Sequence, residues 1–461
     1  MLLKNKYDEL KTFLSGNNIL SEKEECYCYA EDASNLIKPE KFPDVVVFVE
    51  TIKDVQAIMG YAYKNEIPII PRGAGTNMVG ACVSSQGGIV LNFSKMNKIQ
   101  NIDSINMTAT VQPGAILGDI KKAAEKKGLF FPPDPSNYEV STIGGAIAQS
   151  SGGALGFKYG TTKDYVLSLK VVTADGKLIT LGAQTSKDSA GYHLAQLMVG
   201  SEGTLAVIVE ATLKLIPKPP AQEALSAYFD LLEEGMSAVN KIIENKIFPA
   251  AIDFMDNNAL ITVEDYTHCG LNTSKNCMLL LTVDGTEKDI IDQIDSIKNI
   301  LENNGASEIK VSQNIDEYDS IWNARRTSFA ASARLAPDVV TDDIIVPRNN
   351  LAHMVNFCQY VAKKYNLKMC MVGHAGDGNI HPQIALNLDS EEEYRNCMDA
   401  RAEMYQKALE LGGTISAEHG IGSEKKIYLK NTVDIEAIEY MKIIKKLFDP
   451  KNILNPDKIF S

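Results

Sequence analysis

Two short segments in the second half of the chain combine residue types that bind a divalent metal. The first reads Gly-His-Ala-Gly-Asp-Gly-Asn-Ile-His over residues 373–381, and the second reads Glu-His-Gly over residues 418–420. Two glycines inside the first segment let the chain turn back, which would bring both imidazoles together. A carboxylate would complete a three-ligand site with open positions for substrate. We therefore predict a site formed by His374, His381 and Glu418, with zinc, iron(II) or manganese(II) as candidate ions.

His419, directly after Glu418, is the predicted general base. If Glu418 faces the metal, its neighbour can face the substrate, where a neutral imidazole takes the proton of a hydroxyl group. Coordination of that hydroxyl to the metal would lower its pKa. The alternative is that these histidines cap backbone groups in loops. The chain holds only six histidines, and three lack such neighbours and are predicted to be surface or packing residues: His193, His268 and His353.

An acidic substrate also needs a cation for its carboxylate. Residues 322–326 read Trp-Asn-Ala-Arg-Arg, and a guanidinium group grips a carboxylate through two parallel hydrogen bonds. The candidates are Arg325, Arg326 and Arg334, and a surface salt bridge is the alternative role.

Three glycine-rich stretches in the first half of the chain are typical of backbone that approaches a ligand closely. The first, residues 71–77, follows an apolar strand, and its glycines let backbone N–H groups approach a pyrophosphate. It does not fit the Gly-x-Gly-x-x-Gly pattern of a Rossmann site, because Met78 holds the third position. The others are the tract at 132–160 and the loop at 200–204. A structureless tract this long inside a domain is improbable, so we expect ordered backbone wrapped around a bound group.

Strand and helix patterns alternate around these loops. Apolar runs predict strands at 44–50, 67–71, 89–93, 107–111, 167–174 and 277–283. Helical spacing predicts helices at 51–65, where Thr51 and Asp54 form a capping box, and at 231–245 and 287–303. The first 37 residues and the last 60 read as mainly helical, and Pro-Lys-Pro-Pro at 217–220 marks a boundary.

Six motifs in order make the chain resemble the vanillyl-alcohol oxidase and p-cresol methylhydroxylase superfamily of FAD proteins. Within it, the chain is similar to the group of glycolate oxidase flavoprotein subunits, D-lactate dehydrogenases and D-2-hydroxyglutarate dehydrogenases. The motifs are Pro71–Thr76, Pro132–Ser136, Thr142–Gly145, Lys158–Gly160, Gly200–Gly203 and Asn455-Pro456.

The resemblance implies an α+β fold with a two-lobed FAD-binding domain and a C-terminal α+β cap domain for the substrate. The boundaries expected are a helical segment at 1–37, the FAD-binding domain at 38–217, the cap with the metal loop at 218–415, and a segment at 416–461 that returns to the FAD domain. The implied FAD-binding residues are Pro71, Arg72, Gly73, Ala74, Gly75, Thr76, Asn77, Gly80, Pro135, Ser136, Thr142, Gly144, Gly145, Ser151, Gly152, Gly153, Tyr159, Gly160, Glu202, Gly203 and Asn455.

Two departures from the family pattern bear on how the flavin is held. Covalent members often attach FAD through a histidine in the first loop, but residues 1–192 contain no histidine, so we expect non-covalent FAD. Relatives often have Asn after the paired glycine, where this chain has Ala146, which changes the hydrogen bonding expected at the flavin.

The resemblance also assigns the chemistry. The two histidine motifs match the metal and catalytic residues of D-2-hydroxy-acid dehydrogenases, and the arginine that binds the substrate falls at Arg325. The stretch around Thr341-Asp342 lacks the lysine that 2-hydroxyglutarate enzymes use for a second carboxylate. A short monocarboxylate is therefore expected, with oxidation of D-lactate to pyruvate as the leading reaction.

Reduced FAD must pass its electrons to oxygen, a quinone or another protein, because the sequence shows no second redox centre. Similar subunits pass electrons to an iron–sulfur partner or to electron-transferring flavoprotein, and some pairs with the latter couple lactate oxidation to NAD reduction by electron confurcation, the reverse of electron bifurcation. The alternatives to a hydroxy-acid dehydrogenase are a glycolate oxidase subunit with an iron–sulfur partner, an enzyme of this fold acting on phenols or sugars, and a catalytically silent electron-relay flavoprotein.

Composition excludes several other classes of protein. The net charge of −13 disfavours binding to nucleic acid or to anionic lipid. Eight scattered cysteines argue against a disulfide scaffold and an iron–sulfur cluster, and the Cys26-x-Cys28 pair is taken as incidental. The N-terminus lacks a signal-peptide pattern, and no apolar run approaches about 18 residues, so we expect a cytoplasmic location.

Overall fold

The computed structural model describes residues 7–14 and 18–460. The chain divides into two compact units. Unit 1 comprises residues 1–152, 161–218 and 418–461, and unit 2 comprises residues 153–160 and 219–417. The Pro217–Pro220 stretch falls at one of the junctions, and the chain also changes unit next to Glu418, one of the predicted metal ligands.

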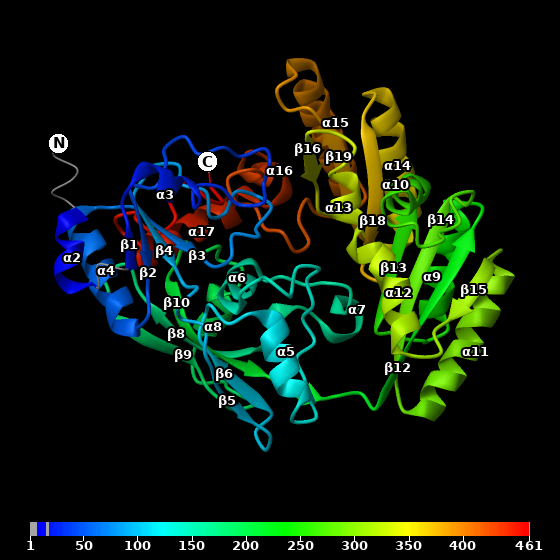
Figure 1. The fold of residues 1–461 in the computed structure, drawn as a ribbon, viewed down its shortest axis with the longest axis horizontal. Coiled ribbons are helices and arrows are strands. Elements are labelled where there is room, and N and C mark those ends of the chain that lie inside the picture. Colours follow the sequence, from blue (N-terminus) through cyan, green and yellow to red (C-terminus); the bar gives the residue numbers. More distant parts are fainter. Residues whose placement is uncertain (1–6, 15–17, 461) are drawn as a thin grey trace. The chain divides into compact units, whose positions relative to one another are not determined.

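Unit 1 contains a small, largely parallel sheet (Figure 1). Its order is β1–β2–β4–β3, with bounds Ile19–Leu20, Val45–Phe48, Ile89–Asn92 and Ile69–Arg72. Strands β2, β4 and β3 are parallel, and β1 adds an antiparallel edge. Helix α4 (Ile52–Asn65) begins at the predicted capping box of Thr51 and Asp54 and packs its apolar face into this core. The C-terminal segment runs beside β3, where Ile69 bridges to Leu454.

A second sheet in unit 1 is antiparallel throughout. Its order is β5–β6–β10–β8–β9, with bounds Ile99–Asp103, Thr108–Val111, Val207–Lys214, Val166–Val172 and Leu178–Gly182. A buried core joins it to short helices, among them α5 (Leu117–Glu125), α6 (Ile143–Gln149) and α8 (Leu194–Met198). A separate pair of two-residue strands, β7 (Leu129–Phe130) and β11 (Ile216–Pro217), adds Leu129 and Ile216 to the same core. The chain ends with α16 (Leu429–Thr432) and α17 (Ile435–Phe448).

Unit 2 is built on one antiparallel sheet with helices packed against it (Figure 1). The order is β15–β12–β14–β13–β18–β19–β16, with β17 paired to β19. The strand bounds are β12 Ala221–Phe229, β13 Ala251–Asp256, β14 Cys277–Gly285, β15 Ser307–Val311, β16 Asp338–Thr341, β17 Ile344–Ile345, β18 Lys368–His374 and β19 Asn379–Leu386. The helix bounds are α7 Gly156–Tyr159, α9 Leu232–Glu244, α10 Asn257–Thr267, α11 Glu287–Asn303, α12 Ile315–Arg326, α13 Ser328–Ser332, α14 Leu351–Lys364 and α15 Glu391–Glu410. Helices α10, α12 and α13 share one buried core with the sheet.

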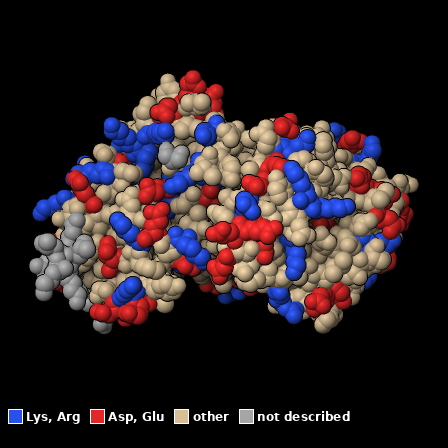
Figure 2. Space-filling model, turned by 90° about the horizontal axis from the view of Figure 1, so that it is seen from above, with Lys and Arg blue, Asp and Glu red and all other residues tan. Residues whose placement is uncertain are grey.

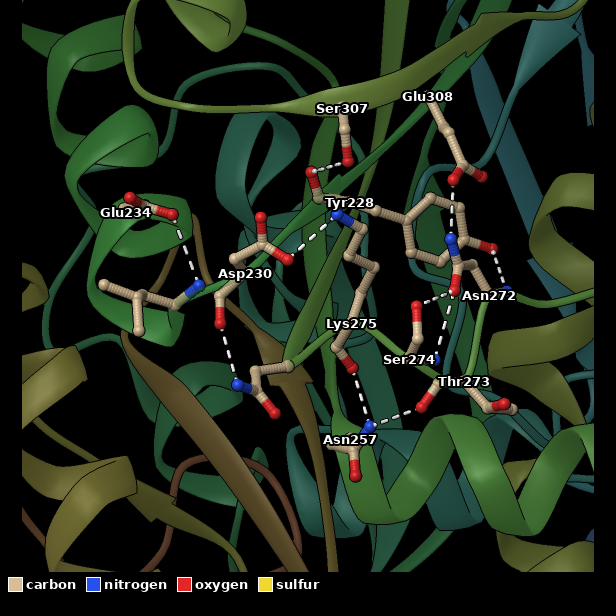
Figure 3. Close-up of polar contacts among 12 residues, drawn as sticks. Tyr228, Asp230, Glu234, Asn257, Asn272, Thr273, Ser274, Lys275, Ser307 and Glu308 are labelled. Carbon is tan, nitrogen blue, oxygen red and sulfur yellow. Dashed lines mark hydrogen bonds and ion pairs between the residues drawn. The ribbon is translucent and has the colours of Figure 1, made fainter.

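A polar network orders the loop between α10 and β14 (Figure 3). Asn257 donates from Nδ2 to the carbonyl oxygens of Thr273 and Lys275, at 2.9 and 2.7 Å. Lys275 in turn pairs with Asp230 at 2.9 Å. These contacts fix the position of the backbone just before β14, which is a central strand of the sheet of unit 2.

The structure differs from the sequence-based expectation at the N-terminus. Within the described residues, 1–37 contain two short helices, α2 (Leu10–Phe13) and α3 (Lys23–Tyr27), and also β1, which pairs with β2. The segment expected to be mainly helical therefore also contains two residues of extended backbone, which gain a sheet edge that no local periodicity announces. Residues 1–6 and 15–17 of that segment lie outside the described residues.

The distribution of charged side chains on the surface and the state of the cysteines agree with what the composition predicts. Figure 2 shows Lys, Arg, Asp and Glu interspersed over the face drawn, without one extended basic area. All eight cysteines are free thiols. No helix in the described part of the chain is both long and apolar enough to cross a membrane.

Candidate functional site

Unit 1 contains a deep cleft built from the glycine-rich stretches. The cleft is lined by residues of all three glycine-rich stretches and opens to solvent at one side. Most of the residues that the family resemblance implied line it: Pro71, Arg72, Gly73, Ala74, Gly75, Thr76, Asn77, Pro135, Ser136, Thr142, Gly144, Gly145, Ser151, Glu202 and Gly203. Glu418 and His419 also lie in its wall.

Six of the implied residues do not line the cleft. Gly80, Gly152 and Asn455 belong to unit 1 but lie behind the lining. Asn455 donates from Nδ2 to the carbonyl oxygens of Ala81 and Glu202, both at 2.7 Å, and so ties two cleft loops together. Gly153, Tyr159 and Gly160 belong to unit 2. There the Tyr159 hydroxyl donates to the Asp284 carboxylate.

The segment that carries Glu418 and His419 is held by contacts within unit 1. Glu202 accepts from the backbone N–H groups of Ile421 and Gly422, at 2.7 and 2.8 Å. Burial raises the pKa of Glu202 to about 7, although these two donors favour its charged form. Asn77 donates to the carbonyl oxygen of His419 at 3.2 Å, and Glu418 accepts from Gly152 N at 3.1 Å. The backbone of the predicted base is therefore fixed by contacts that do not use its imidazole.

The cleft fits a large polar ligand such as FAD. Two polar atoms in its lining, Ser141 Oγ and Gln149 Oε1, are buried without a hydrogen-bond partner among the described residues. Buried polar atoms are normally paired, so a bound dinucleotide would satisfy them. Sequence reasoning missed both, as it missed apolar lining residues such as Phe93 and Ile208, because neither residue type marks a ligand site by itself.

Gly144 offers a test of how tightly this lining is packed. A Cβ on Gly144 would lie 2.7 Å from Pro113 Cβ and 2.9 Å from the Pro113 carbonyl oxygen, so backbone must move. Overpacking of this kind costs roughly 1–3 kcal/mol. We expect Gly144→Ala to weaken FAD binding by about 10-fold to 100-fold, measured by titrating FAD into the apoprotein. Gly60→Ala is the control, because nothing lies within 4 Å of its Cβ position in α4; equal losses in the two variants would contradict the packing argument.

Unit 2 brings the predicted metal-binding histidines together. His374 ends β18 and His381 lies on β19, with ring centroids 5.3 Å apart and planes nearly perpendicular. Both side chains are buried. One ring nitrogen of each lies within 4.8 Å of the other. The separation allows both imidazoles to approach one ion after small side-chain movements, so the pair fits a divalent metal.

Acidic groups orient both rings. His374 Nδ1 lies 2.8 Å from Asp253 Oδ1. His381 Nδ1 lies 3.4 Å from the carbonyl oxygen of Asp342 and 3.8 Å from Asp343 Oδ1. Metal-binding histidines commonly place one ring nitrogen against a carboxylate or carbonyl oxygen in this way. The predicted third ligand, Glu418, belongs to unit 1 and stays a prediction.

Arg325 lies beside the same acidic group. It is 9% exposed on α12, and its Nε lies 2.9 Å from Asp253 Oδ2. Burial alone would raise the pKa of Asp253, but the adjacent His374 and Arg325 outweigh it, so this pKa lies below its usual value. Of the alternates, Arg326 makes an exposed contact with Asp319 at 3.4 Å, and Arg334 stacks over Tyr266.

The remaining histidines are exposed, as predicted. His193 lies just before α8, His268 just after α10, and His353 within α14. Their surroundings give no reason to assign them chemistry.

Comparison with known proteins extends these observations. The family described as "FAD linked oxidases, C-terminal domain" matches residues 218–459, and "FAD binding domain" matches residues 43–182. Glycolate oxidase subunit GlcD from Bacillus subtilis is 42% identical over 422 residues, which is 92% of this chain and 90% of the relative. D-lactate dehydrogenase from Anaerostipes hadrus is 35% identical over 427 residues, 90% and 89% of the two chains. Among solved structures, p-cresol methylhydroxylase aligns with a TM-score of 0.82 at 15% identity, over 99% of this chain and 96% of that one, which confirms the predicted fold class.

Proposed function

Because this chain belongs to the FAD-linked oxidase family, as an oxidoreductase of its 2-hydroxy-acid dehydrogenase group, we propose that it oxidises a short 2-hydroxy acid. The leading reaction is the conversion of D-lactate to pyruvate. The Anaerostipes relative named D-lactate dehydrogenase supports this choice, and the glycolate oxidase subunit makes glycolate the runner-up.

One observation carries the proposal: the cleft that fits FAD has an imidazole, His419, in its wall. FAD bound there would supply flavin N5 as a hydride acceptor. A general base must come within hydrogen-bond reach of the proton that it removes. In the proposed reaction His419 takes the proton of the hydroxyl group, bound FAD would accept the hydride from the carbon that carries this hydroxyl, and the product is the 2-oxo acid.

In the proposal, unit 2 supplies the binding groups for the acid. His374 and His381 would hold a divalent metal, with Glu418 as the third ligand, and the metal would polarise the hydroxyl group. Arg325 binds the carboxylate, because a guanidinium held in place by an acidic neighbour loses less freedom when it binds an anion. Zinc, iron(II) and manganese(II) all suit this donor set.

The preference for a monocarboxylate rests on what lies at residue 341. The position holds a buried threonine, and the next residue, Asp342, is paired with Arg401. A second substrate carboxylate would therefore meet no free lysine at this place in the sequence. This favours lactate or glycolate over 2-hydroxyglutarate.

The electron acceptor proposed is another protein. Electron-transferring flavoprotein is the first candidate, in a confurcating reaction that reduces NAD, and an iron–sulfur subunit is the second. The support comes from the family, in which one relative is named as a subunit of glycolate oxidase.

Anaerobic reduction of the bound flavin tests the proposal. The purified protein is mixed with D-lactate, L-lactate, glycolate, D-2-hydroxyglutarate and L-2-hydroxyglutarate, and the loss of oxidised-flavin absorbance is followed. We expect D-lactate to reduce the flavin fastest, with glycolate slower and 2-hydroxyglutarate slower by at least about tenfold, the discrimination that one unpaired charged group provides. Fastest reduction by glycolate would support the glycolate oxidase alternative. If no acid reduces the flavin, the alternative that remains is a catalytically silent electron-relay flavoprotein.

A further inference from the structure

The carboxylate of Asp253 joins two side chains to which the proposed reaction gives different tasks. Asp253 lies on β13, directly opposite His374 on β18 in the register of the antiparallel pair. Its Oδ1 is 2.8 Å from Nδ1 of His374, and its Oδ2 is 2.9 Å from Nε of Arg325. The residue is 1% exposed. A single rigid group at the centre of a sheet therefore contacts both the candidate metal ligand and the candidate carboxylate binder.

Each contact has a chemical consequence. When Nδ1–H of an imidazole donates to a carboxylate, the tautomer is set and the lone pair lies on Nε2, the opposite ring atom, whose basicity rises. When Nε of an arginine faces a carboxylate, the two terminal Nη groups form the outward edge of the fork, which can grip a second carboxylate end-on. Both consequences depend on the charge of Asp253 and not only on its shape.

We propose that Asp253 is a positioning residue that sets His374 for metal binding and Arg325 for substrate binding through one shared carboxylate. This inference rests on the proposed function. It goes further in coupling the two tasks: a change at Asp253 alters metal affinity and the KM for the hydroxy acid together. A purely structural buried ion pair would alter neither of them selectively.

Asp256 provides a matched control on the same strand. It is also fully buried, at 0% exposed, but it accepts from backbone N–H groups, those of Ala259 at 2.9 Å and Met371 at 3.0 Å. Asp256→Asn removes the same charge from the same strand without touching His374 or Arg325. Loss of fold caused by neutralising a buried aspartate in β13 therefore appears in both variants, whereas loss of positioning appears only at Asp253.

The test compares FAD-loaded wild type, Asp253→Asn, Asp253→Glu and Asp256→Asn. Zinc alone is titrated into metal-stripped protein by calorimetry, and KM is measured after reloading with saturating zinc. We expect Asp253→Asn to bind zinc about 10-fold to 100-fold more weakly, the usual effect of losing a partner of a metal-bound histidine. We also expect Asp253→Asn to raise the KM for the hydroxy acid. Asp253→Glu should recover part of the zinc affinity and part of the KM, and Asp256→Asn should resemble wild type in both quantities. The effect of Asp253→Asn on KM should shrink in a protein that already carries Arg325→Lys, because both changes remove the same contact.

The outcomes separate this inference from the proposed function. If wild type binds zinc and is reduced by a hydroxy acid, but Asp253→Asn matches Asp256→Asn in zinc affinity and KM, the positioning role is wrong and the proposed function stands. If wild type binds no zinc, the inference fails as stated for zinc, whereas the proposed function keeps iron(II) and manganese(II) as its candidate ions.

Discussion

Replacing His419 by alanine is expected to leave FAD bound and to slow flavin reduction by the hydroxy acid about 10²-fold to 10⁴-fold, the usual contribution of a general base. The fold around the residue should survive, because its backbone carbonyl, not its imidazole, accepts the hydrogen bond from Asn77. Glu202 continues to accept hydrogen bonds from the backbone N–H groups of Ile421 and Gly422. The rate of flavin bleaching is measured by anaerobic stopped-flow at saturating substrate.

A matched variant and a rescue sharpen this experiment. His193→Ala removes an exposed histidine of unit 1 and should leave the rate unchanged. Added imidazole should restore part of the rate of His419→Ala if the missing group is a base, and the flavin spectrum should be unchanged throughout. Full turnover by His419→Ala would show that the base lies elsewhere.

Sequence patterns predicted those elements whose ends are set by contacts between residues close together in the chain. The capping box of Thr51 and Asp54 located the start of α4 to the residue, because its hydrogen bonds join positions three apart. Helix α11 has the predicted bounds, 287–303, for the same reason. The glycine-rich loops were recognisable because close approach of backbone to a ligand restricts residue type.

Contacts between distant residues could not be predicted in this way. Asp253 interrupts an apolar strand, and nothing nearby in the sequence says that it faces His374, 121 positions away. That pairing depends on the register between β13 and β18, which the whole sheet sets. The assignment of residues 153–160 to unit 2 is a similar case, because their glycines continue the composition of the preceding cleft loops while Leu155 packs into the core of unit 2.

Replacing Arg401 in unit 2 is expected to cost a large share of its stability, because Arg401 forms a fully buried ion pair. Its Nε and Nη2 donate to the two oxygens of Asp342, at 2.8 and 3.0 Å, and Nη2 also contacts the Tyr405 hydroxyl at 2.8 Å. Arg401 and Asp342 are both 0% exposed. Removing one partner of a buried pair leaves the other charge without compensation, which costs roughly 3–5 kcal/mol. We expect that loss for Arg401→Met in the urea unfolding of unit 2.

Two further variants separate the charge effect from the loss of packing. Arg326→Met removes a guanidinium that is 42% exposed and paired with Asp319, and it should cost no more than about 1 kcal/mol. Arg401→Met combined with Asp342→Leu should recover most of the loss, because a well-packed apolar pair can replace a buried ion pair at little cost. If the double variant is as unstable as Arg401→Met alone, the loss comes from packing at α15, and not from the uncompensated charge.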